Sequence, residues 1–145
     1  MNITIDRSHG FALPAKFYAL VEKELAKVTL PAANNSAAIT LNFSDADYSA
    51  ATDGYHPVEI RLEKQPSDHD KNQWQLIYLT DFSYQGGAYP ELVKEIDVCF
   101  VTKQVYCLYG GWLSPRHARE MIALFVGNFI SYHAMTIYDV NVSVE

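Results

Sequence analysis

Apolar and polar residues alternate in a series of short segments between residues 38 and 112, and this alternation constrains the fold more than any other feature of the chain. In the segment AITLNF, Ile39, Leu41 and Phe43 would face one way and the residues between them the other. A period of two is typical of β-strands with one buried face. Four further segments repeat it, and shorter ones occur near both ends of the chain. The pattern predicts a mainly antiparallel sheet of about six or seven strands.

The pairing of these strands follows from the requirement that their apolar residues share one face. It places Leu62 opposite Leu76 and, in the following hairpin, Phe82 opposite Leu92. In the same register the chain's two cysteines lie opposite each other, where a disulfide is geometrically conceivable. Because no signal peptide is visible, two reduced thiols are expected instead.

Two segments change to helical spacing. Residues 13–28 carry an apolar stripe with charged residues pointing outward. Ser114 and Pro115 are a strong helix start, and a second apolar stripe follows them as far as His133. Both helices are expected to cover the apolar face of the sheet. This predicts an α+β fold, with residues 1–145 as a single domain.

The other face of the sheet would carry an apolar centre surrounded by acidic residues. Its apolar members would be Ile77, Leu79, Val93 and Tyr109. A sheet face exposed to water is normally more uniformly polar, so something is expected to cover this patch. One interpretation is that a terminal strand or loop folds over it. The other is that the patch forms an interface, in a homodimer or with a protein partner.

The segment DFSYQGGAYPEL, residues 81–92, joins two of the expected strands. Gly86 and Gly87 permit a positive φ, and the connection is longer than a two-residue turn. A turn of this kind needs the glycines but not Tyr84 and Tyr89, and tyrosine is a frequent contact residue. We interpret the segment first as a turn and second as a recognition loop.

Composition limits the partners that this chain can have. In 145 residues, 11 Lys and Arg oppose 17 Asp and Glu, giving a net charge of -6 and a pI near 5.3, with no basic stripe. This balance argues against nucleic acid and anionic membrane surfaces as partners, because both attract clustered positive charge. A mean hydropathy of -0.09 predicts no transmembrane helix, and the start MNITIDRSHG lacks the features of a signal peptide. We therefore expect a cytoplasmic location.

His56, Asp53, Asp81 and Tyr84 form the strongest catalytic constellation that the sequence offers. The register brings His56 and Asp81 to one end of the sheet, where a histidine beside a carboxylate could act as a general base. No nucleophile motif or phosphate-binding loop accompanies them. The alternative is structural, with Asp81 capping a turn and His56 packing at a strand end. Enzymatic activity is left open, and a non-enzymatic role is favoured.

Metal and cofactor sites are not predicted. The segment DADYSAATDG, residues 45–54, supplies several oxygen donors, as calcium loops do. It lacks the mid-loop glycine, however, and His56 stands where a calcium loop has its bidentate glutamate. The two cysteines do not have the CxxC spacing of a zinc site. Turn formation explains the segment better.

The motifs ITLNFSDADYSA, GYHPVEIRL, YLTDFSYQGGAYPELVKEIDVCF and GGWL resemble a family of small gammaproteobacterial proteins, domain of unknown function 2787. The resemblance covers most of the chain, from the first expected helix to the last expected strand. It implies a roll of the cystatin or nuclear-transport-factor type, in which a curved antiparallel sheet wraps around a helix. It implies no activity and assigns no catalytic residue.

Two functions are consistent with these observations. The first is a non-enzymatic interaction domain that forms a homodimer through the second sheet face, with the segment from Tyr84 to Tyr89 as a contact site. The second is a small-molecule-binding protein or an enzyme, with a pocket at the His56 and Asp81 end of the sheet. Rolls of this kind often hold ligands between sheet and helix.

Overall fold

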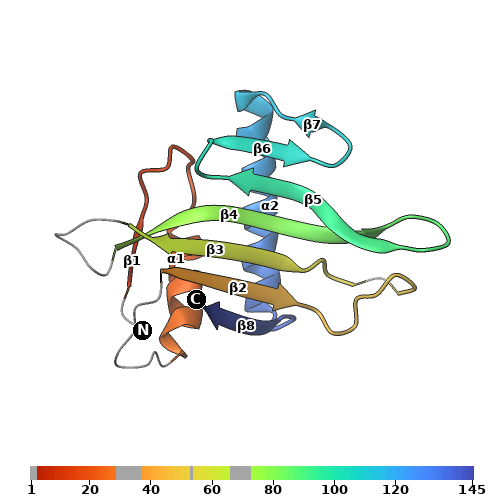
Figure 1. Ribbon diagram of the computed structural model, residues 1–145, viewed down its shortest axis with the longest axis horizontal. Coiled ribbons are helices and arrows are strands. Elements are labelled where there is room, and N and C mark those ends of the chain that lie inside the picture. Colours follow the sequence, from red (N-terminus) through yellow and green to blue (C-terminus); the bar gives the residue numbers. More distant parts are fainter. Residues whose placement is uncertain (1–2, 29–36, 53, 66–72) are drawn as a thin grey trace.

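The computed structural model describes residues 3–28, 37–52, 54–65 and 73–145 of the chain, and it places two helices on one face of a single sheet (Figure 1). The helices are α1 (Ala15–Ala26) and α2 (Pro115–Ala134). The strands are β1 (Thr4–Asp6), β2 (Ala38–Ser44), β3 (Val58–Lys64), β4 (Gln73–Gln85), β5 (Glu91–Cys99), β6 (Gln104–Cys107), β7 (Gly111–Trp112) and β8 (Asp139–Val144). The predicted α+β class, with a mainly antiparallel sheet and two helices on one face, is confirmed.

The strand order shows how the chain connects the two edges of the sheet. The order is β7-β6-β5-β4-β3-β2-β8, and β1 pairs with the start of β4 in the one parallel pairing among the described strands. Consecutive strands from β2 to β7 pair antiparallel with their neighbours. Helix α2 then leaves β7 and crosses the sheet, so that β8 can pair with β2 at the opposite edge (Figure 1).

The start of α2 and its apolar stripe account for its place across the sheet. The Ser114 hydroxyl accepts a hydrogen bond from the His117 backbone N–H at 3.3 Å, and Pro115 occupies the first turn, as predicted. The buried positions of α2 recur at helical spacing and pack against strand residues such as Phe43, whose ring lies 4.9 Å from that of Phe129. Sequence periodicity therefore identified the helix faces that form the core.

A bulge in β4 changes the register along the sheet. Leu62 lies opposite Leu76 as predicted, but Arg61 lies opposite Tyr78, so Ile77 is an extra residue in β4. The bulge reverses the alternation beyond it. Leu79 therefore faces the helices and is fully buried in the core, with 0% of its surface exposed. Its predicted place on the second sheet face is wrong.

A second bulge lies in β5, where Phe82 pairs with Lys94 rather than with Leu92, and Glu95 is the extra residue. The predicted register of this hairpin is therefore wrong. The predicted placement of the two cysteines opposite each other is also wrong, because in the regular β5–β6 pairing Cys99 lies opposite Gln104 and Cys107 opposite Ile96. Both cysteines are free thiols.

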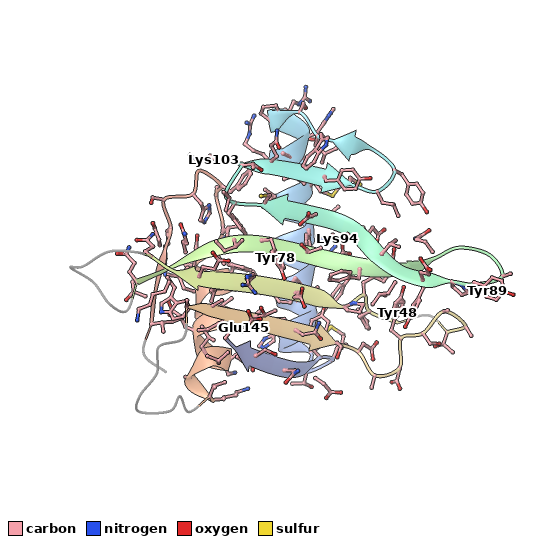
Figure 2. The ribbon with its side chains drawn as sticks, viewed as in Figure 1. Tyr48, Tyr78, Tyr89, Lys94, Lys103 and Glu145 are labelled. Atoms are coloured by element: carbon pink, nitrogen blue, oxygen red, sulfur yellow. The ribbon has the colours of Figure 1, made fainter. Side chains whose placement is uncertain are left out.

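The centre of the sheet face away from the helices is polar in the part of the chain that the structure describes. Tyr78 donates a hydrogen bond from its hydroxyl to Glu59 at 2.7 Å, and Thr80 donates to Asp97 at 2.6 Å. Lys94 lies above the Tyr78 ring, 5.9 Å from its centroid, and both are visible on this face (Figure 2). Such a face can remain in water without a covering element.

The predicted apolar patch does not form on this face. Leu79 is in the core, and Val93 pairs with Ser83 on the helix side, two positions from Asp81. Tyr109 lies in the turn between β6 and β7 and is 80% exposed. The patch assumed uninterrupted alternation, and the two bulges interrupt it.

Candidate functional site

A cavity of about 360 Å³ lies between the sheet and α2. Its volume is within the range of small-molecule sites, which span roughly 300–1,000 Å³. Three parts of the chain enclose it: the segment before β3, the middle of β4 and β5, and the second half of α2 with the residue before β8. The lining residues are Gly54, Tyr55, His56, Val58, Asp81, Glu95, Ile96, Leu124, Phe125, Asn128, Phe129, Tyr132 and Tyr138.

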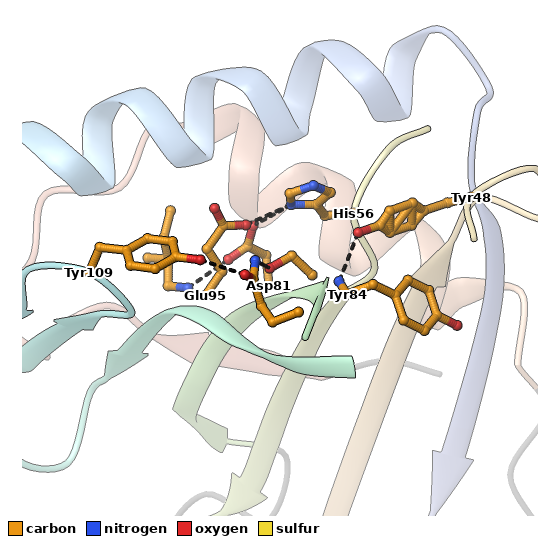
Figure 3. A network of polar contacts seen from close by, with 9 residues as sticks. Tyr48, His56, Asp81, Tyr84, Glu95 and Tyr109 are labelled. Atoms are coloured by element: carbon orange, nitrogen blue, oxygen red, sulfur yellow. Dashed lines mark hydrogen bonds and ion pairs between the residues drawn. The ribbon is translucent and has the colours of Figure 1, made fainter. Parts of the chain in front are cut away.

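His56, Asp81 and Glu95 converge at the polar end of this cavity, beneath α2 (Figure 3). The His56 Nδ1 atom lies 2.8 Å from Glu95 Oε2 and 3.4 Å from Asp81 Oδ2. One potential ligand atom from each residue lies within 4.8 Å of the other two. The three side chains therefore share one small volume, although they come from three different segments.

The segment before β3 holds His56 in place through an internal network. The Asp45 carboxylate accepts a hydrogen bond from the Tyr55 backbone N–H at 3.0 Å, and the Tyr48 ring lies against the His56 ring with centroids 5.1 Å apart. The Tyr48 hydroxyl accepts from the Tyr84 backbone N–H at 2.9 Å, which ties the segment to β4. A Cβ on Gly54 would lie 2.8 Å from Tyr48 Cα and Cβ, so this close approach requires glycine.

The two carboxylates are placed by the bulge in β5. Asp81 faces the helices at the point where the bulge begins, and its Oδ1 accepts a hydrogen bond from the Ile96 backbone N–H at 2.8 Å. Because Glu95 is the extra residue, it and Ile96 both line the cavity although they are adjacent in the strand. A regular strand would have directed one of them to the other face.

Burial and the neighbouring carboxylate make Asp81 an unusual acid. Asp81 is 8% exposed, and burial together with the charge of Glu95 raises its pKa to about 6, against the opposing effects of the Ile96 N–H and His56. No lysine or arginine is among the described residues that line the cavity. Its polar end is therefore acidic, with two carboxylates and one imidazole among its described residues.

Aromatic residues form most of the remaining walls. Tyr55 and Tyr132 close one side, with ring centroids 4.5 Å apart, and Phe129 packs against Tyr138 at 5.8 Å. Burial, followed by the nearby Tyr132, raises the pKa of Tyr138, so its hydroxyl stays protonated in the physiological range. Leu124 and Asn128 are exposed and lie one turn apart on α2, which places them at the mouth. The cavity joins an acidic end to an apolar body.

The structure brings only some of the predicted catalytic residues together. His56 and Asp81 lie together, and among the described residues Tyr48 links Tyr84 to His56. Asp53 lies outside the described residues. Glu95 completes the cluster and was missed, because uninterrupted alternation places it on the opposite face. A visible signal was the excess of polar residues in the middle of β5, which weakens any strict period-two assignment there.

Comparison with known proteins places this chain in a family. The sequence pattern of a family described as a protein of unknown function (DUF2787) matches residues 15–143. The chain belongs to this family. No curated protein matches it.

Two solved structures from Vibrio cholerae resemble this DUF2787 protein. The hypothetical protein VC0508, from the VSP-II pathogenicity island, is 30% identical with a TM-score of 0.86, covering 99% of this chain and 100% of that chain. The conserved hypothetical protein VC1805, from pathogenicity island VPI-2, is 30% identical with a TM-score of 0.79, covering 97% of this chain and 100% of that chain. VC1805 is described as sharing structural homology with the human P32 protein.

The contact residues predicted for the DUF2787 hairpin lie around its tip. The connection between β4 and β5 spans residues 86–90, and Gly86 has a φ of 110° as its predicted turn role requires. Tyr89 is 90% exposed at the tip (Figure 2). Tyr84, near the end of β4, is 37% exposed. Tyr109 donates a hydrogen bond from its hydroxyl to Gln85 at the end of β4.

Among the described residues, neither helix has the length and apolar character needed to span a membrane.

Proposed function

We propose that this protein binds a small molecule in the cavity between the sheet and α2. The observation that carries the proposal is the cavity itself, with three convergent ionisable side chains at one end and aromatic walls at the other. A few convergent polar groups within a mainly apolar cavity are the usual composition of a ligand site. The ligand would place a polar group against His56, Asp81 and Glu95 and an apolar body against α2.

The energetics of Asp81 support a functional rather than a structural role. A buried carboxylate that faces a second carboxylate destabilises the folded protein at neutral pH, as its raised pKa indicates. An asparagine could accept the same hydrogen bond from Ile96 without that cost. Residues that reduce stability without a structural reason are typical of binding sites, where stability is commonly traded for function.

The test blocks the mouth of the cavity without touching the core. Asn128→Trp adds a large side chain at an exposed lining position of α2, and Ala123→Trp is a matched control at an exposed position of α2 that does not line the cavity. Both variants and the wild type would be heated with a panel of small molecules that carry a polar group and an aromatic body. A ligand at 100 times its Kd stabilises by about 2.7 kcal/mol, which raises the Tm of a chain this size by roughly 8 °C.

We expect at least one compound to raise the Tm of the wild type and of Ala123→Trp but not of Asn128→Trp. A panel that stabilises none of the three proteins would contradict the proposal. Equal stabilisation of all three would also contradict it, because the compound would then bind elsewhere.

Self-association is a second candidate, favoured by the exposed hairpin tip. Tyr89 and Leu92 are exposed apolar side chains on one hairpin, and such residues are frequent at interfaces. The partner would be a second copy of this chain, which replaces the homodimer expected through the second sheet face. Sedimentation of Tyr89→Ser with Leu92→Ser would give a monomer where the wild type gives a dimer, while Val101→Ser, an exposed apolar control, would not. A wild-type monomer would exclude this candidate.

The cytoplasmic location stays a prediction.

A further inference from the structure

We propose that His56, Asp81 and Glu95 bind a divalent transition-metal ion at the acidic end of the cavity. The inference rests on the proposed function for one point, namely that a molecule in the cavity completes the coordination of the ion. Metal binding by these three side chains is otherwise independent of what fills the apolar part. It adds a metal where the sequence predicted none.

The distances suit a shared ion. Protein nitrogen and oxygen ligands lie about 2.0–2.2 Å from zinc, so neighbouring ligand atoms in a tetrahedral or octahedral shell are about 3.0–3.5 Å apart. His56 Nδ1 lies 2.8 Å from Glu95 Oε2 and 3.4 Å from Asp81 Oδ2, and all three residues offer an atom within 4.8 Å of the others. Small side-chain rotations would therefore be enough to enclose an ion.

The hydrogen bonds of the cluster are incomplete without a cation. Nδ1 of His56 carries at most one hydrogen, yet it faces oxygen atoms of both Asp81 and Glu95. Glu95 Oε2 is buried, and among the described residues it depends on His56 Nδ1, 2.8 Å away, for a partner. Buried polar atoms are normally satisfied, and one hydrogen on Nδ1 cannot fully serve both carboxylates. A metal ion would satisfy Nδ1 and both carboxylates together.

The surroundings favour a doubly charged ion. The described residues that face the cluster from α2 are uncharged, and none of the lining residues is a lysine or arginine. Two carboxylates therefore remain without a fixed compensating charge. The neutral imidazole and two carboxylates are a mixed nitrogen and oxygen set, which suits zinc, iron or manganese better than calcium or magnesium, whose ligands are oxygen.

The second layer of contacts fits the same role. The Tyr48 ring lies against the His56 imidazole, and the Ile96 N–H holds Asp81 Oδ1, so both ligands have a supported orientation. Partners of this kind orient metal ligands in known sites. Three protein ligands with the cavity on the open side are the arrangement of metal sites that accept an exogenous molecule.

The test is calorimetric titration of Zn²⁺ into the chelator-stripped full chain. Glu95→Gln and Asp81→Asn each remove one ligand charge, and Glu91→Gln makes the same change at an exposed position of the same strand outside the cavity. We expect one ion per chain in the wild type and in Glu91→Gln, with affinity weaker by at least about 100-fold in the two site variants. Absence of binding to the wild type, or equal binding to all four proteins, would overturn the proposal.

A second measurement needs no variant. In the wild type, Zn²⁺ should shift the imidazole NMR signals of His56 and leave those of His9, His117 and His133 in place. A shift at another histidine without one at His56 would overturn the metal site even if the site variants did not fold. Mg²⁺ at the same concentration should leave the His56 signals unchanged.

The outcomes separate the two proposals. If small molecules bind in the cavity but Zn²⁺ does not bind, the metal site is wrong and the proposed function stands. If Zn²⁺ binds through the three side chains but no small molecule is blocked by Asn128→Trp, the metal site stands and the proposed function is wrong. If an amine binds to the chelator-treated protein and Zn²⁺ does not bind to it, the ligand is an organic cation and the metal site is wrong.

Discussion

Replacing Asp81 with asparagine should stabilise the chelator-treated protein at neutral pH, although it removes a charged group from a well-ordered site. The asparagine side chain would keep an oxygen to accept the 2.8 Å hydrogen bond from the Ile96 N–H. It would remove the buried charge that faces Glu95. The substitution therefore keeps the local geometry and removes the electrostatic cost of the carboxylate.

The size of the expected gain in stability follows from the pKa of Asp81. Burial, and to a smaller extent the charge of Glu95, raises this pKa from 3.8 to about 6. This pKa difference lowers the free energy of unfolding by at most about 3 kcal/mol. The full loss applies when the carboxyl is ionised in both the folded and the unfolded chain. Below pH 3.8 the carboxyl is protonated in the folded and the unfolded chain, so it costs nothing. The cost grows between the two pKa values and is complete above about pH 6.

The assay is urea denaturation at two pH values with chelator present throughout. We expect Asp81→Asn to raise the unfolding free energy by about 1–3 kcal/mol at pH 7.5 and by only about 0.5 kcal/mol at pH 4. Asp97→Asn on the polar sheet face is the control and should give no gain, because it weakens the hydrogen bond from Thr80. A loss of stability at pH 7.5, or a gain of equal size at both pH values, would show that the buried charge is not the cause.

Three further predictions test the surroundings of the site and the core. Gly54→Ala should weaken ligand binding about 10-fold in the thermal-shift assay, because its Cβ would lie 2.8 Å from Tyr48 Cα and displace that ring; unchanged binding would contradict this. Burial alone would raise the pKa of Glu24, but hydrogen bonds from His133 and a neighbouring lysine lower it overall. The stability that Glu24 adds to the folded protein is therefore present above pH 4.5 and is lost as the pH falls further. Urea titrations from pH 6 to pH 3 should therefore show a smaller acid loss in Glu24→Gln than in the wild type, and parallel curves would exclude the effect. Leu79→Ala should cost about 2–5 kcal/mol in urea, since Leu79 is fully buried, and a variant as stable as the wild type would place it outside the core.

The fold could be predicted from the sequence because its elements depend on local periodicity. The stripe of α2 and its Ser114 cap, the alternation of β2 and β3, and the glycine turn after β4 all appear as expected. The pairing beyond β3 could not be predicted in the same way. Each bulge adds one residue to one strand, and the residue types at Ile77 and Glu95 do not by themselves fix where the insertion lies.

The site could be predicted only in part from the sequence, for the same reason. The proximity of His56 and Asp81 depends on the β3–β4 pairing, which the expected register approximated closely enough. Glu95 joins them only because of the β5 bulge, and the wall of the cavity comes from α2, which is distant in sequence. A three-dimensional cluster from residues 56, 81 and 95 has no motif spacing that a sequence pattern could show.

Native mass spectrometry of the protein isolated gently from its own cells tests most directly whether the cavity holds a ligand. We expect a reproducible added mass on each wild-type chain and on each Ala123→Trp chain, and its absence from Asn128→Trp. The value of that mass would give the ligand class, and a metal would appear as a separate increment lost with Glu95→Gln. A wild-type chain without added mass, or the same added mass on Asn128→Trp, would contradict ligand binding in this cavity.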